Sequence, residues 1–139
     1  MGLIQFPEYS NLLISEVELQ GHDNRTYRLG NDLLIRIPTA ESYALKVAME
    51  QDLLAKLAKY LSVDIPAPIK MGVSSEIFPY SFSIYKWLEG KSANHLAKDD
   101  IMLESVALQL AVFLKELQSI NDVKGPAPGQ HNRWRGLPC

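Results

Sequence analysis

Alternating apolar and polar residues, or short apolar runs, occur in five segments and predict five strands. These segments are 14–19, 25–29, 33–37, 69–73 and 81–87. Gly30-Asn31-Asp32 separates two of them and predicts a hairpin turn, because these residues tolerate a positive φ. Short turns between successive strands favour an antiparallel sheet.

Two longer segments carry apolar residues at helical spacing. The segment 39–61 has one apolar stripe, made of Tyr43, Val47, Leu54, Leu57 and Leu61. Thr39 suits the N-cap of this helix. The segment 100–120 has a second stripe, made of Leu103, Val106, Ala107, Leu110, Leu114 and Leu117. The pattern therefore predicts an α+β fold, with a five-stranded antiparallel sheet, one packed helix, a linker and a long final helix.

Glu50 falls on the apolar stripe of the first helix, where an unpaired carboxylate is expensive to bury. In one interpretation its partner is Arg36, which points into a cleft and holds phosphate oxygens through its fixed donors. In the other, alternate apolar residues of 33–37 form the buried face and Arg36 is solvated. Glu50 then lies at the helix edge near Lys46. The pattern by itself favours the second interpretation.

Two further segments have both a chemical and a structural interpretation. Gly21-His22-Asp23-Asn24 is either a phosphate-covering loop or an ordinary hairpin turn, and its single glycine favours the turn. His22 in this position is more typical of a surface residue than of an acid or base. Tyr85-Lys86-Trp87-Leu88-Glu89-Gly90 is either a slot for a flat base or the end of a strand with core aromatics. Taken singly, each aromatic favours the core.

Composition narrows the function classes. The chain has 139 residues, 47% hydrophobic and 22% charged, as in one globular domain. Its net charge of −2 and dispersed cations give no indication of nucleic acid or an anionic membrane as a partner. The three histidines show no metal-ligand spacing. The pair Arg133 and Arg135 beside Trp134 is a weak nucleic-acid candidate, and a solvated loop is the better interpretation.

The cysteine content and the apolar segments of the sequence indicate where the protein is located. Cys139 is the single cysteine, which favours a reducing compartment. The sequence shows no signal peptide and no apolar segment long enough to span a membrane. A cytoplasmic location is therefore expected.

Taken in order, several segments resemble the front half of an aminoglycoside phosphotransferase family protein, within the protein-kinase-like fold. The resemblance covers nearly the whole chain. It is carried by Gly21 to Gly30, Leu34 to Pro38, Glu50-Gln51, Ile65 to Pro68, Ser83 to Gly90, Gly129 to Asn132 and Arg135-Gly136. It changes the preferred interpretation of Arg36 and Glu50 from a structural to a functional pair.

The resemblance implies a nucleotide site. Gly21, His22, Asp23 and Asn24 would form the loop over the phosphates. Arg36 would stand where kinases usually carry a lysine, with Glu50 as its helix partner. Tyr85, Lys86, Trp87 and Leu88 would form the hinge beside the purine, chiefly through backbone groups. The donor would be ATP or GTP with Mg²⁺, and the acceptor a hydroxyl of a small molecule, commonly an aminoglycoside or macrolide antibiotic.

The resemblance also divides the chain. Residues 1–84 would be a kinase-like N-lobe, 85–90 the hinge, and 91–139 the start of a truncated C-lobe. The family's His-x-Asp catalytic loop and its metal-binding aspartate segment are absent from this sequence, so no catalytic residue or Mg²⁺ ligand is assigned. We expect a fragment, a truncated gene product or a frameshifted remnant that is inactive alone.

An alternative is a non-enzymatic nucleotide- or protein-binding module that reuses the N-lobe. In that case the helix at 100–120 would expose an apolar face and could support self-association.

Overall fold

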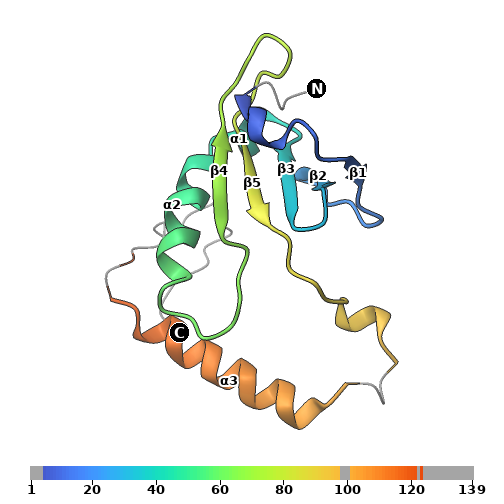
Figure 1. Cartoon of the computed structure of the whole chain (residues 1–139). Coiled ribbons are helices and arrows are strands. Elements are labelled where there is room, and N and C mark those ends of the chain that lie inside the picture. The colour runs from blue at the N-terminus through green and yellow to red at the C-terminus, as the bar shows by residue number, and fades with distance from the viewer. Residues whose placement is uncertain (1–4, 98–100, 122, 124–139) are drawn as a thin grey trace.

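Five antiparallel strands form the centre of the structure, a computed structural model that describes residues 5–97, 101–121 and 123. The strands are β1 (Ile14–Glu16), β2 (Asn24–Leu29), β3 (Leu33–Pro38), β4 (Pro68–Gly72) and β5 (Phe82–Lys86). The helices are α1 (Glu41–Ala44), α2 (Val47–Leu57) and α3 (Leu103–Ser119), with 3-10 turns η2 (Pro7–Tyr9) and η3 (Ala93–His95). The strand order is β1-β2-β3-β5-β4, which confirms the predicted α+β fold (Figure 1).

The turn between β2 and β3 follows the prediction, because Gly30 adopts a φ of 60° that favours glycine. The first strand is shorter than predicted and ends at Glu16 rather than Leu19. Beyond it, the side-chain amide of Gln20 accepts from the Thr26 N–H at 2.8 Å and donates to the Thr26 carbonyl at 2.8 Å. Gln20 therefore takes the place of a strand partner, and the ladder stops.

One face of the sheet holds the apolar core. Leu29, Ile35, Phe82 and Ile84 are buried together there, and Phe6, Tyr9 and Phe78 pack against them. The Phe6 and Phe82 rings meet edge to face, with centroids 6.3 Å apart. Gly72 lies opposite Phe82, whose ring occupies the space that a Cβ would need. A side chain at position 72 would therefore collide with the Phe82 ring of the core.

The other face of the sheet carries Arg36 and further polar side chains. The register places two rows of side chains on it: Thr26, Arg36 and Ser83 in one, and Arg28, Leu34 and Tyr85 in the next. α2 lies against this face, since its Glu50 contacts both Arg36 and Tyr85. The sheet thus separates an apolar face from a polar one.

The predicted helix 39–61 is two helices. Lys46 N–H donates to the Tyr43 carbonyl three residues back, so the chain tightens after α1 and α2 starts afresh at Val47. Thr39 does not cap α1, whose N-cap is Ala40. The Thr39 hydroxyl instead contacts the carbonyls of His22 and Asp23, both at 3.1 Å. A tertiary contact has replaced the local cap.

α3 stands apart from the sheet and has no buried residue (Figure 1). The predicted start of this helix at Asp100 lies outside the described residues. The backbone N–H and the hydroxyl of Ser62 both donate to the Glu116 carboxylate, at 2.9 and 3.0 Å. These bonds join α3 to the loop after α2. The exposed apolar residues of the helix are Leu103, Val106, Leu108, Leu110, Val112, Leu114 and Leu117.

The segment before β1 borders the end of β4. The side-chain amide of Gln5 donates to the Val73 carbonyl at 2.8 Å and accepts from the Val73 N–H at 2.9 Å. Glu8 also pairs with Lys70 at 3.4 Å. Within the described ranges, no helix has the length and apolar character needed to cross a membrane.

Candidate functional site

Arg36 of β3 and Glu50 of α2 meet on the polar face of the sheet. Arg36 Nη1 lies 3.8 Å from Glu50 Oε2. The Tyr85 hydroxyl of β5 donates to the same carboxylate oxygen at 3.4 Å. The Arg36 guanidinium stands 5.8 Å from the centre of the Tyr85 ring. Three elements that are distant in sequence therefore share one charged cluster.

The geometry combines features of both interpretations of this pair. Leu33, Ile35 and Ile37 lie on the core face and Arg36 on the other, as in the second interpretation, while Arg36 contacts Glu50, as in the first. Lys46, the alternative partner of Glu50, has its ammonium 5.8 Å from the Tyr43 ring instead. The Arg36 and Glu50 side chains are 36% and 39% exposed, and their contact is at the outer limit of an ion pair. Among the described residues, the Arg36 side chain makes no hydrogen bond besides this contact, and a guanidinium offers further donors of fixed geometry.

Tyr85 contributes a buried group to the cluster rather than an open surface. The residue is only 1% exposed. Burial raises the pKa of its phenol above the usual value, and the Glu50 carboxylate adds to this rise. The Ser83 hydroxyl and the Arg36 charge oppose it. The hydroxyl therefore remains a neutral donor to Glu50.

The loop predicted to cover phosphates lies at the start of β2. Gly21, His22 and Asp23 are exposed, and Asn24 is the half-buried first residue of the strand. The His22 ring meets the Tyr43 ring edge to face, with centroids 6.5 Å apart.

Two side chains hold this loop. The amide of Gln20 pairs with the Thr26 backbone on one side, and the Thr39 hydroxyl contacts the carbonyls of His22 and Asp23 on the other. The Thr39 N–H adds a third bond, to the Asp23 carbonyl at 3.0 Å. Sequence reasoning missed both roles, since Gln20 follows no periodic pattern and Thr39 matched a helix cap.

The predicted hinge begins inside β5 and leaves the sheet at its far end. The Lys86 N–H donates to the Ala67 carbonyl at 3.3 Å, and the Trp87 N–H to the Asp32 carbonyl at 2.7 Å. Leu88 is half-buried, and its N–H donates no hydrogen bond within the part of the chain that the structure describes. Of the three successive amides, that of Leu88 is available to a ligand.

Arg28 is a residue of this region that the sequence did not reveal. Its guanidinium lies 4.4 Å from the centre of the Trp87 ring. Its Nη2 pairs with Glu89 Oε1 at 2.7 Å and donates to the Asn31 carbonyl at 2.9 Å. Arg28 thereby connects β2, the turn after it and the hinge.

The loop, the charged cluster and the hinge follow β3 along its length. Asn24 pairs with Pro38 at one end of β3, and Leu33 pairs with Lys86 at the other. Five residue steps separate these ends, or roughly 16 Å at ~3.3 Å per residue. Arg36 lies between them. The arrangement suits an extended anionic molecule with one end at the loop and the other at the hinge.

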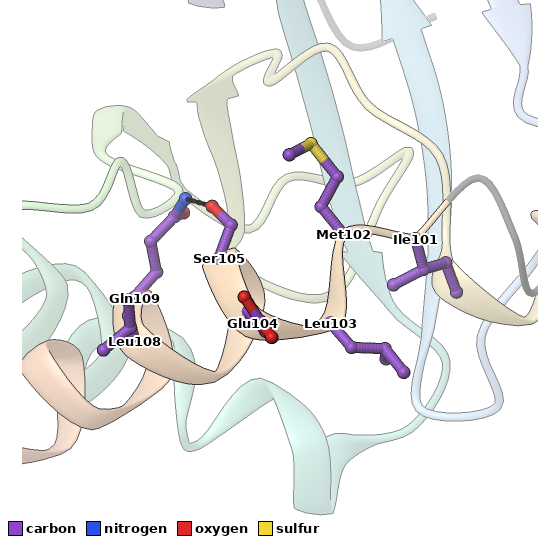
Figure 2. Close-up of a pocket in the computed structure, with 7 residues that line it drawn as sticks. All are labelled: Ile101, Met102, Leu103, Glu104, Ser105, Leu108 and Gln109. Atoms are coloured by element: carbon purple, nitrogen blue, oxygen red, sulfur yellow. Dashed lines mark hydrogen bonds between the residues drawn. The ribbon is translucent and has the colours of Figure 1, made fainter.

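A separate hollow of about 680 Å³ lies at the start of α3 (Figure 2). Its lining is mostly apolar, with Glu104 as the charged member and a 3.2 Å hydrogen bond from Gln109 to Ser105. The lining residues are Ile101, Met102, Leu103, Glu104, Ser105, Leu108 and Gln109. None of them belongs to the predicted site, so this hollow is distinct from it.

The site residues do not form a metal centre. Among the residues that the structure describes, no group of three or more His, Cys, Asp or Glu side chains could hold a metal ion. The magnesium implied by the resemblance therefore finds no ligand set here, and no chemical step is assigned to it. The tail with Arg133, Trp134 and Arg135 lies outside the described residues.

The sequence matches a known protein family over most of its length. The model of the phosphotransferase enzyme family matches residues 16–137. The chain belongs to this family. A search of curated proteins gave no match.

Solved members of the phosphotransferase enzyme family have the same fold. The GDP complex of wild-type aminoglycoside 2'-phosphotransferase-IIIa matches with 25% identity and a TM-score of 0.73, over 87% of this chain and 40% of that chain. The GDP and kanamycin complex of APH(2")-IIIa matches with 26% identity and a TM-score of 0.73, over 87% and 41%.

The streptomycin–ATP–APH(2")-IIa ternary complex matches with 23% identity and a TM-score of 0.61. The match spans 87% of this chain and 39% of that chain, and it supports the fold alone. The phosphotransferase chain therefore spans about two fifths of the length of these relatives, and it corresponds to their N-terminal part.

Proposed function

We propose that this chain is the nucleotide-binding part of a small-molecule O-phosphotransferase. The whole enzyme would transfer the terminal phosphate of ATP or GTP to a hydroxyl of an aminoglycoside- or macrolide-type antibiotic. Residues 1–84 are the N-lobe, 85–90 the hinge and 91–139 the start of the C-lobe. A cytoplasmic location is part of this proposal.

The Arg36–Glu50 pair is the observation that carries the proposal. Arg36 lies on the polar face of the sheet, and Glu50 of α2 is the carboxylate that it contacts among the residues the structure describes. A guanidinium offers planar, paired donors to phosphate oxygens. The loop Gly21 to Asn24, whose first three residues are exposed, leads into β2 near Arg36 and would supply backbone N–H groups to phosphates.

The hinge supplies the purine end of the site. Among the described residues the Leu88 N–H has no hydrogen-bond partner and could donate to the edge of a base, whereas the N–H groups of Lys86 and Trp87 already have partners. The two solved relatives at 25% and 26% identity were determined with GDP, which supports a purine nucleotide at this site.

The chain alone is proposed to bind nucleotide without transferring phosphate. Its sequence contains no His-x-Asp motif that could supply a catalytic base. The base, the Mg²⁺ ligands and the acceptor groups would come from the remainder of the family fold. Binding is therefore the activity to measure.

Calorimetric titration with GDP tests the role of Arg36. Arg36→Ala should weaken GDP binding about tenfold, because a charge-assisted contact to phosphate is lost. Binding of guanosine, which has no phosphate, should not change. Lys56→Ala is the matched control, since Lys56 pairs with Asp52 on the exposed side of α2. Equal GDP affinity of the Arg36→Ala variant and the unsubstituted chain would exclude this role.

A second candidate is a non-enzymatic nucleotide- or protein-binding module. It is favoured by α3, which exposes apolar side chains along 17 residues and has none buried. In this proposal a second copy of the chain covers α3. Sedimentation velocity should then show a dimer that Leu110→Glu dissociates. A monomer at all concentrations argues against it.

A further inference from the structure

Arg28 joins the sheet to the hinge through three groups. Its guanidinium lies 4.4 Å from the centre of the Trp87 ring, and its Nη2 contacts both Glu89 and the Asn31 carbonyl. The contact to Glu89 spans 61 residues of sequence. Arg28 is thus held in the hairpin between β2 and β3 and reaches the segment that follows β5.

These contacts surround Leu88. Trp87 is fixed on one side by Arg28 and by its own N–H bond to the Asp32 carbonyl at 2.7 Å. Glu89 is fixed on the other side at 2.7 Å from Arg28. A residue between two anchored neighbours has few backbone conformations left. Arg28 thus contacts the side chains of both neighbours of Leu88.

We propose that Arg28 is a positioning residue of the nucleotide site. This inference rests on the proposed function, because it concerns the same hinge. Arg28 itself need not touch the nucleotide. It holds the hinge so that the Leu88 N–H can meet the purine edge, and Arg28 lies on the same face of the sheet as Arg36.

The planarity of the guanidinium is needed for this role, in addition to its charge. The Arg28 and Glu89 side chains are 31% and 76% exposed, and an ion pair in such a position is weak by itself. A flat guanidinium can stack on Trp87 and pair with Glu89 at the same time, whereas an ammonium is a compact point charge. Arg28→Lys should therefore keep the charge and lose the positioning.

The test uses the full chain carrying Trp134→Phe, which leaves Trp87 as the one remaining tryptophan. GDP affinity is measured by calorimetry and the surroundings of Trp87 by fluorescence emission. Arg28→Gln and Arg28→Lys should each weaken GDP binding about fivefold. They should also shift the Trp87 emission to longer wavelength, because the ring gains contact with water.

Lys70→Gln is the matched control. It removes one positive charge from β4, where Lys70 pairs with Glu8 and lies across from Ile84, on the opposite face of the sheet. It should change neither measurement. If Arg28→Gln does not fold, Glu89→Gln replaces it, with a smaller loss of affinity expected.

Wild-type affinity in Arg28→Lys would overturn the proposal, since charge alone would then suffice. Unchanged affinity in Arg28→Gln, with clear GDP binding by the unsubstituted chain, would overturn it as well. Absence of GDP binding by the unsubstituted chain is a different result. It would refute the proposed function first, and the positioning role with it.

Discussion

Tyr85 connects the core of the sheet to the candidate site. Its ring is buried in β5, while its hydroxyl emerges beside Glu50 at 3.4 Å. The carboxylate accepts this bond and also faces Arg36. One rigid side chain can therefore hold Glu50 in place without restricting Arg36.

The raised pKa of Tyr85 makes a pH-dependent prediction. Above pH 10 the phenol ionises in the unfolded chain, while the folded chain keeps its proton. The unfolded state then binds fewer protons, so the free energy of unfolding should fall as the pH rises through the folded-state pKa. Tyr85→Phe should reduce this loss. Urea unfolding of both proteins at pH 9 and pH 11 measures it, and an identical pH dependence would contradict the assignment.

At the residue scale, the sequence pattern drew attention to Arg36 and Glu50, because a charge on an apolar pattern is conspicuous, but by itself it favoured a solvated Arg36, and their contact is seen only in the structure. The pattern did not identify Arg28, Gln20 or Thr39. Their partners are backbone carbonyls, an indole ring and a carboxylate, reached through folds of the chain that no local period encodes. Such contacts become visible only when the register of the sheet is known.

Among the elements, the loop from Gly21 to Asp23 differs from the usual phosphate loop. Glycines normally allow the close approach and free N–H groups that phosphate needs. Here a single glycine is combined with two side-chain supports, from Gln20 and Thr39. Side chains before and after the loop thus hold its backbone, in place of additional glycines within it.

Thr39→Val tests this support. The substitution keeps the size of the side chain and the backbone bond to Asp23, but it removes the hydroxyl donor. Stability should fall by about 1 kcal/mol, and GDP affinity several-fold, because the loop carbonyls lose a fixed partner. Thr39→Ser, which keeps the hydroxyl, is the control. Chemical denaturation and calorimetry measure the two effects, and equal GDP affinity in both variants would refute the role.

The order of the elements was predictable, whereas several boundaries were not. Alternation and turn residues located all five strands, and helical spacing located α2 and α3. The break between α1 and α2 was missed, because the apolar stripe of 39–61 continues through it. Periodicity records which side chains face the sheet, but it does not record where hydrogen bonding changes.

At the scale of the whole molecule, the sheet and α3 should differ in local stability. Strands β3 and β5 lie in the middle of the sheet with ladders on both sides. α3 has no buried residue. Hydrogen exchange of the isolated chain should therefore be much faster in α3 than in β5, since few buried contacts oppose local opening. Equal protection of the two elements would show that another surface covers the helix.

The pairing of β2 with β3 follows from the short turn at Gly30, whereas no turn in the sequence places β5 between β3 and β4. The position of α3 could not be predicted. An amphipathic pattern reveals an apolar stripe but not the element that will cover it.

The two hydrogen bonds between Gln5 and Val73 also bear on aggregation through the edge of the sheet. A strand at the border of a sheet presents unpaired backbone groups, which can recruit another chain and begin a growing fibril. β4 is such a border strand, and Gln5 occupies both polar groups of the residue that follows it. A single side-chain amide from the N-terminal segment thus closes a position where aggregation could start.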